Sequence, residues 1–156
     1  MKLTANFTLE EMIGSDYATR MGRPVWPPDG KYAEQVLPNL TRVARDLLEP
    51  IRTLTGAAVL VSSGYRPVWL NEAIGGAPGS AHIEGRAADI RSGGKLTPPQ
   101  LAAAIVAARL SALDKVILEF GRWVHVQVAR DGEPPRGKVF TAVRSAGKTV
   151  YIPGLA

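Results

Sequence analysis

The segment Trp123–Val128, with the sequence WVHVQV, constrains the fold more than any other part of the chain. Side chains alternate between the two faces of a β-strand, so the three valines share one face while Trp123, His125 and Gln127 share the other. The valine face predicts contact with an apolar core. The opposite face is polar and aromatic, which is typical of the floor of a cleft. The segment therefore predicts a sheet whose two faces serve different purposes.

Other segments predict helices and further strands around this one. Apolar residues at three- and four-residue spacing from Leu40 to Leu54 predict an amphipathic helix that Pro50 kinks and Gly56 ends. Thr97 to Gln100 combines a cap, a proline at the first helical position and a glutamine at the third, so a helix runs from there to about Leu110. Further elements are a short helix after Thr8 and strands at Ala58–Val61, Val116–Phe120, Val139–Val143 and Thr149–Ile152.

Helices that precede a series of hairpin-linked strands indicate an α+β fold. We expect a central antiparallel sheet with helices packed on one face. The chain has 156 residues and neither an internal repeat nor a low-complexity linker, which predicts one domain over residues 1–156. Hydrophobic residues make up 46% of the sequence and charged residues 21%, so the composition argues against intrinsic disorder.

Composition also excludes several kinds of site. The chain has no cysteine, which removes disulfides, thiolate metal ligands and cysteine nucleophiles. Its net charge is +5, but the basic residues are scattered and no run of them alternates with aromatics, so we expect no nucleic-acid groove. No apolar run approaches the ~20 residues that span a bilayer, so we expect no stable membrane insertion. Met1–Glu10 does not resemble a secretory signal, which predicts synthesis in the cytoplasm and another route of export.

Two histidines and one aspartate stand out as candidates for metal binding. His82 and Asp89 belong to the segment Ser80–Ile90, in which small residues surround the histidine, and His125 lies in the strand described above. Two imidazoles and a carboxylate with one open position form the pattern of a catalytic zinc site. Taken alone, however, Asp89 could also cap a turn or pair with an arginine, and His125 could be an ordinary hydrogen-bonded strand histidine. Spacing does not show that residues 43 positions apart meet in space.

Several motifs occur together and in a fixed order. They are Ser62–Arg66, Leu70-Asn71, Gly75-Gly76, Ser80–Asp89 and Trp123–Val126. With this set the chain resembles the zinc D-alanyl-D-alanine carboxypeptidase family, in particular its small phage-type endolysin members. The resemblance extends over nearly the whole chain and implies the fold that is also called hedgehog-like.

The resemblance also implies roles for individual residues. Arg66 matches an arginine that binds a substrate carboxylate or stabilises the oxyanion, and a guanidinium has the geometry for this. Ser80 matches a position that helps to hold the substrate peptide, and Tyr65 and Trp123 are further candidates for substrate contacts. The matches to the zinc ligands are His82, Asp89 and His125.

The general base is assigned by the resemblance rather than by geometry. Some branches of the family carry a carboxylate three residues before the last histidine, where this chain has Arg122, which cannot accept a proton. The hedgehog-like branch has a glutamate six residues before it, which here is Glu119. A two-residue turn at Gly121-Arg122 would pair Glu119 with Val124 and place it on the valine face, whereas a bulge or a longer turn would restore the role. Some branches also carry a second transition-state donor, a histidine, where this chain has Trp123.

The implied activity is zinc-dependent hydrolysis of peptidoglycan stem peptides by a monomeric enzyme. The bond would be D-Ala-D-Ala at the end of the stem or L-Ala-D-Glu near the glycan. A phage or prophage enzyme that acts at the bacterial cell wall fits the resemblance, and the basic surface suits an anionic wall. An alternative is a non-catalytic cell-wall-binding module on the same fold, in which the metal is structural or absent. A basic nucleic-acid binder is a third class, without support from any motif.

Overall fold

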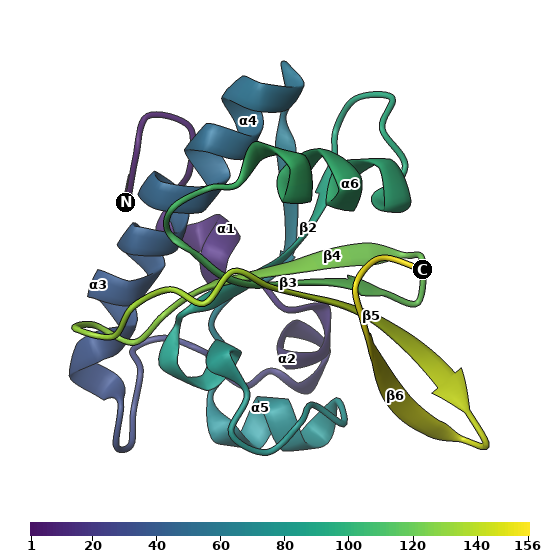
Figure 1. Ribbon diagram of the computed structural model, residues 1–156. Coiled ribbons are helices and arrows are strands. Elements are labelled where there is room, and N and C mark those ends of the chain that lie inside the picture. Colours follow the sequence, from purple (N-terminus) through teal and green to yellow (C-terminus); the bar gives the residue numbers. More distant parts are fainter.

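The computed structural model describes residues 1–156 and contains one six-stranded sheet with the strand order β1-β2-β4-β3-β5-β6 (Figure 1). The two strands at its centre are β4, which corresponds to the alternating segment Trp123–Val128, and β3, which contains most of the predicted strand Val116–Phe120. The strands are β1 Val59–Ser63, β2 Ala87–Ser92, β3 Leu113–Glu119, β4 Trp123–Val128, β5 Lys138–Ser145 and β6 Lys148–Pro153.

Helices flank the sheet, and two of them begin where the capping residues predict. Thr8 and Thr97 each accept a hydrogen bond from the backbone three residues on, and Glu11 and Gln100 return the contact. None of the helices combines the length and the apolar character needed to cross a lipid bilayer. The helical segments are α1 Leu9–Ile13, α2 Asp16–Met21, α3 Ala33–Val43, the π-helical turn η1 Ala44–Leu48, α4 Glu49–Thr55, α5 Val68–Ala73, the 3₁₀ turn η2 Ala81–Glu84 and α6 Pro98–Ala108.

The amphipathic helix predicted from Leu40 to Leu54 is longer than expected. It begins at Ala33 and continues through α3, η1 and α4 without a break. Pro50 lacks an N–H and its ring displaces the carbonyl one turn earlier. The wider π-helical turn η1 lies directly before it and accommodates this. Gly56 ends the helix in the left-handed conformation, at φ 65°, as the sequence predicts.

The core lies on the valine face of the sheet. Val124, Val126 and Val128 belong to one buried cluster together with apolar residues of α3, η1, α4 and α6. The side chains on the other face of β4 are absent from that cluster. Figure 1 shows the long helix formed by α3, η1 and α4, together with α6, beside the central strands, while the β5–β6 hairpin extends away from these helices. The α+β prediction is therefore confirmed, and the two faces of the sheet differ as expected.

The prediction that the sheet is antiparallel is wrong for one strand pair. β5 runs parallel to β3, with Lys115 opposite Lys138 and Glu119 opposite Ala142. The antiparallel strand β4 ends beside the start of β3, and β5 begins at that same end of the sheet. Two guanidinium nitrogens of Arg136, just before β5, bind the Asp114 carboxylate at 2.8 and 2.9 Å. These contacts hold the beginning of β5 beside the beginning of β3. The sheet is consequently mixed.

Candidate metal centre and cleft

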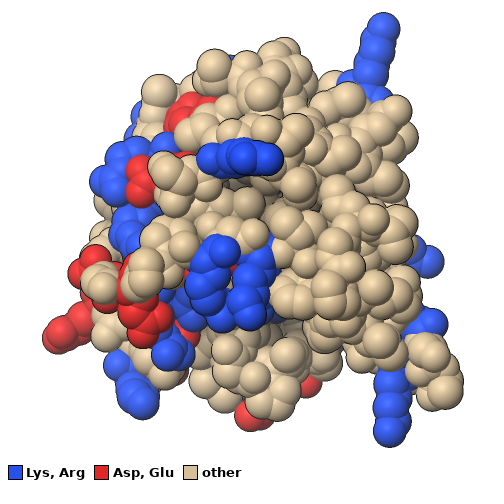
Figure 2. All heavy atoms as spheres, viewed as in Figure 1, with Lys and Arg blue, Asp and Glu red and all other residues tan.

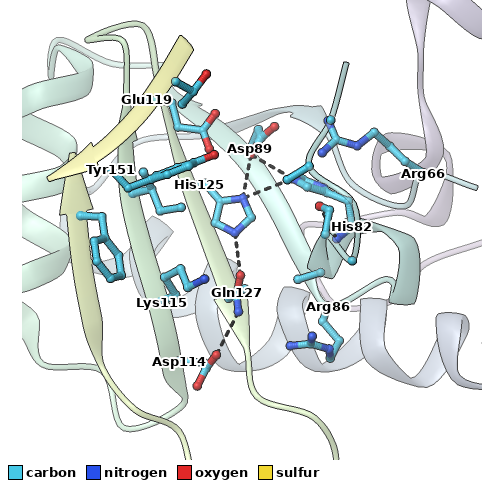
Figure 3. A pocket seen from close by; sticks show the side chains of 18 of the residues that line it. Arg66, His82, Arg86, Asp89, Asp114, Lys115, Glu119, His125, Gln127 and Tyr151 are labelled. Carbon is cyan, nitrogen blue, oxygen red and sulfur yellow. Dashed lines mark hydrogen bonds and ion pairs between the residues drawn. The ribbon is translucent and has the colours of Figure 1, made fainter. Parts of the chain in front are cut away.

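A cavity of about 1000 Å³ opens on the polar face of the sheet. Its walls come from β2, β3, β4, the β5–β6 hairpin, the turn η2 and the loop before it (Figure 3). Trp123, His125 and Gln127, the polar face predicted from the alternation of residues 123–128, thus line this cleft.

The two histidines and the aspartate meet in this cleft. Asp89 in β2 is paired directly with His125 in β4, so the two side chains lie side by side on the polar face. His82 lies on η2, and its ring points to the same place (Figure 3). Nε2 of His82 lies 3.1 Å from Oδ1 of Asp89, and Nδ1 of His125 lies 3.2 Å from each of those atoms. All three side chains are buried, and no fourth His, Cys, Asp or Glu joins the group.

Local backbone contacts hold His82 in position. The Ser80 hydroxyl accepts a hydrogen bond from the His82 backbone N–H and caps η2. Gly85 ends η2 at φ 72°, and a Cβ at this glycine would lie 2.8 Å from the backbone oxygen of Val36. The small residues around His82 therefore permit a tight turn against the long helix. The backbone N–H of Arg66 also donates to the carbonyl of His82, which links the two residues.

The hydrogen-bond partners of the imidazoles determine where their protons lie. Nδ1 of His82 lies 2.7 Å from the carbonyl oxygen of Gly64, which can only accept, so Nδ1 carries the proton. Nε2 of His125 lies 2.8 Å from Oε1 of Gln127, whose amide nitrogen donates to Asp114. The proton of His125 is thus on Nε2. When both rings are neutral, two ring lone pairs and a carboxylate oxygen face one another, and a cation would stabilise this arrangement.

The donor set and its dimensions fit zinc. Ligand distances of about 2.0–2.1 Å around a tetrahedral ion separate neighbouring ligand atoms by about 3.3 Å. The separations of 3.1–3.2 Å in this group are close to that value. Nitrogen and carboxylate ligands without thiolate suit zinc, and a hydrogen bond from the second ring nitrogen is typical of ligating histidines. His82, Asp89 and His125 could therefore hold a zinc ion.

Burial and mutual charge shift the pKa values of the three groups. Burial lowers the pKa of His82, although Asp89 opposes the shift. Burial also acts to lower the pKa of His125, but the Asp89 carboxylate outweighs it and raises that pKa. Burial alone would raise the pKa of Asp89, whereas His82 and His125 hold it well below its usual range. The carboxylate is therefore ionised at neutral pH, as a metal ligand must be.

The structure corrects the expected hairpin register. Glu119 is paired with Trp123 rather than with Val124, because the turn consists of three residues, Phe120 to Arg122. Phe120 and Gly121 both have positive φ, at 56° and 66°. The extra residue places Glu119 on the polar face, where it lines the cleft beside the candidate metal ligands (Figure 3). Burial raises the pKa of Glu119, and the negative charge of Asp89 raises it further.

Arg66 enters the cleft from the side opposite Glu119 (Figure 3). Its guanidinium makes no hydrogen bond or ion pair within the protein, and its Nε is buried without a partner. Burial lowers the pKa of Arg66, and the carboxylates of Asp89 and Glu119 offset part of this. Such a group is free to bind an anionic or carbonyl acceptor. Ser80 lines the same cleft but already caps η2.

The other two predicted substrate contacts differ in position. Trp123 lines the cleft, packs against Phe120 at 5.6 Å between ring centroids and has an indole N–H without a partner. Tyr65 is only 2% exposed, does not line the cleft and packs edge-on against Trp26 in the core. The backbone N–H of Tyr65 donates to the carbonyl of Met12 in α1. Tyr65 therefore lies outside the cleft, and its contact with substrate stays a prediction.

Three residues that support His125 were not among the predicted site residues. Gln127 accepts from His125 and donates to Asp114, which in turn binds Arg136 (Figure 3). Strand alternation already places Gln127 on the face of His125, and that signal could have identified it. Asp114 could not be found in this way, because it lies where the β3–β4 register is irregular.

Charges along the cleft are unequally paired. Lys and Arg side chains gather near the centre of the face shown in Figure 2, with Asp and Glu beside them. Among the cleft residues, Arg86 and Arg130 bind Glu84 and Arg136 binds Asp114. Cations without a carboxylate partner also line the cleft; they are Arg66, Lys115 and Arg144. The cleft can thus accept negatively charged groups.

Comparison with known proteins agrees with this geometry. A family profile described as Peptidase M15 matches residues 5–127, which is most of the chain and includes all three candidate ligands and Glu119. No curated protein sequence matches the chain at a significant level. The match confirms the resemblance to zinc D-alanyl-D-alanine carboxypeptidases that the motifs indicate. This chain belongs to the peptidase M15 family.

Proposed function

We propose that the protein is a zinc-dependent peptidase that hydrolyses stem peptides of bacterial peptidoglycan. One observation carries the proposal: two imidazole lone pairs and a carboxylate oxygen converge at the floor of a cleft that also holds Glu119. Membership of the peptidase M15 family supports it. His82, Asp89 and His125 are the proposed ligands.

A zinc ion at these ligands would supply Lewis-acid chemistry, which polarises a carbonyl and lowers the pKa of water. Glu119 is the proposed general base, which takes a proton from the attacking water and later delivers it to the leaving amine. Its raised pKa suits both tasks, because the carboxyl group must gain and lose a proton near neutral pH. Arg66 is the proposed substrate clamp, and its unpaired guanidinium can donate to a substrate carboxylate or to the developing oxyanion.

The substrate class follows from the family and from the unpaired cations of the cleft. Stem peptides carry free carboxylates, and Arg66, Lys115 and Arg144 provide positive charge that no carboxylate of the protein pairs. The bond cut is D-Ala-D-Ala or L-Ala-D-Glu, and the site of action is the cell wall. The likeness to phage-type endolysins makes a phage or prophage origin part of the proposal.

Digestion of purified peptidoglycan, followed by mass analysis of the released fragments, tests the proposal. We expect hydrolysis by the zinc-loaded protein, loss of hydrolysis with a chelator, and recovery when zinc is restored. New amino termini on D-Glu would identify an endopeptidase, and released D-Ala would identify a carboxypeptidase. Binding to peptidoglycan without any fragment, in the zinc-loaded protein, would refute the proposal and favour a wall-binding module.

Glu119→Gln separates catalysis from metal binding. We expect this variant to retain zinc and to lose about 10²–10⁴-fold in the hydrolysis rate, which is the usual contribution of a general base. Glu72→Gln is the matched control, because Glu72 is exposed on α5 and lies outside the cleft. Unchanged hydrolysis by Glu119→Gln would remove Glu119 from the mechanism.

A further inference from the structure

The β5–β6 hairpin brings a tyrosine to the row of residues that contains Glu119. Trp123, Glu119, Ala142 and Tyr151 are successive partners across β4, β3, β5 and β6. Directly paired residues share a face of the sheet, so all four side chains lie on the cleft side. Tyr151 lines the cleft. Sequence reasoning did not identify it as a site residue.

Ala142 lets the tyrosine reach across its strand. Neighbouring strands lie about 4.8 Å apart, so Tyr151 and Glu119 are separated by about two such spacings. Between them stands only the methyl group of Ala142, which is fully buried. Figure 3 shows the Tyr151 ring lying across the cleft face with its hydroxyl end toward Glu119. A larger side chain at position 142 would occupy the space over which the ring lies.

The phenol is available as a hydrogen-bond donor. Among the hydrogen bonds of the structure, none involves the Tyr151 hydroxyl, and 49% of the residue is exposed. Partial burial raises the pKa of Tyr151, and the charges of Glu119 and Asp89 raise it further, so the phenol keeps its proton at neutral pH. Arg66, whose Nε has no partner in the protein, faces the ligand group from the opposite side (Figure 3). A peptide that lies across the ligand group would therefore meet a cation at one wall and a neutral hydroxyl at the other.

We propose that the β5–β6 hairpin forms a wall of the substrate cleft and that the Tyr151 hydroxyl donates a hydrogen bond to a backbone carbonyl of the bound peptide. This inference rests on the proposed function for the nature of the substrate. In this arrangement Arg66 binds a carboxylate of the peptide, and Tyr151 binds the peptide backbone on the other side of the candidate metal ligands. The family match ends at residue 127, so this wall lies outside the matched segment.

Binding is measured in the zinc-loaded Glu119→Gln protein, so that the peptide stays intact. The probe is the synthetic stem peptide L-Ala-γ-D-Glu-L-Lys-D-Ala-D-Ala, and the assay is isothermal titration calorimetry. We expect Tyr151→Phe in this background to weaken binding about 2- to 10-fold, which is the value of one neutral hydrogen bond. Tyr17→Phe is the matched control, because it removes the same atom from a tyrosine of α2 outside the cleft, and we expect no change.

Kinetics of the active enzyme give the second readout. If the hydroxyl binds substrate and transition state equally, Tyr151→Phe raises KM by the same factor and leaves kcat within about twofold. Unchanged affinity and KM would overturn the proposal, and so would a fall in kcat at unchanged KM, which would place the hydroxyl in the transition state only. A wild-type protein that binds the peptide without cutting it would refute the proposed function but not the assignment of Tyr151.

Discussion

Gln127 offers a test of the metal centre that leaves its three ligands untouched. The Gln127 amide oxygen is the only acceptor for Nε2–H of His125, at 2.8 Å, and both side chains are buried. Methionine has nearly the same length as glutamine but offers no such acceptor. Gln127→Met would therefore leave the buried Nε2–H of His125 without a hydrogen-bond acceptor. That costs about 1–3 kcal/mol, or about 5- to 150-fold in an equilibrium constant. His125 can avoid the cost only by moving its proton to Nδ1, the atom that would bind the metal.

We therefore expect Gln127→Met to weaken zinc affinity about 10- to 100-fold. Affinity is measured by competition with a chromophoric chelator. The apoprotein should lose only about 1 kcal/mol of unfolding free energy, because without a metal His125 can place its proton on Nδ1 beside Asp89, and Asp114 keeps its three hydrogen bonds from Arg136. Gln35→Met is the control, since Gln35 is exposed on α3. Zinc affinity within twofold of wild type in Gln127→Met, or an equal loss in the control, would refute the assignment of the metal site.

Four further outcomes are expected. Gly85→Ala should lower the unfolding free energy by about 1–3 kcal/mol and weaken zinc binding, because residue 85 has positive φ and the added Cβ would press on the Val36 backbone. Thermal denaturation measures the loss of stability, and chelator competition measures zinc affinity. Arg66→Lys should reduce kcat/KM for the stem peptide about 10-fold or more while zinc content stays the same, because a lysine cannot form two parallel hydrogen bonds. The rate should fall as the pH drops through the raised pKa of Glu119, so the acid limb of the pH–rate profile should lie above the ordinary pKa of a glutamate; a limb at that ordinary value would contradict the role. The pKa of Asp114 is lowered by its arginine partner, so its contribution to stability is present above the ordinary pKa of an aspartate and is lost as pH falls; Asp114→Asn should flatten the acid part of the stability–pH curve, measured by urea denaturation.

The sequence was most informative where a local rule decides the outcome. Alternation along residues 123–128 assigned both faces of β4 correctly, and the capping boxes at Thr8 and Thr97 located two helix starts. These features depend on a few neighbouring residues. Side-chain alternation and cap hydrogen bonds are therefore visible without knowledge of the fold.

Expectations were wrong where a distant segment decides the outcome. The turn after β3 has three residues because Phe120 adopts positive φ, and its backbone N–H is held by the carbonyl of Ala142 in β5. The sequence around Phe120 does not reveal that partner. The parallel pairing of β5 with β3 likewise joins segments that are apart in the chain, with Arg136 bound to Asp114 where the two strands begin. Tyr65 was a candidate for substrate contact, and only the tertiary structure shows that its ring packs against Trp26 away from the cleft.

The proposed metal ligands and the proposed general base are positioned by different parts of the sheet. The Asp89–His125 pair is set by β2 and β4, whereas Glu119 is set by the hairpin turn that joins β3 to β4. Glu119 lies two residues beyond Ile117, which is the partner of His125. About 7 Å along the strand therefore separates the position of Glu119 from the level of His125. A change in turn length would move every side chain of β3 to the opposite face without altering the β2–β4 register. The three-residue turn thus places the carboxylate of Glu119, the proposed general base, on the same face of the sheet as the candidate metal ligands.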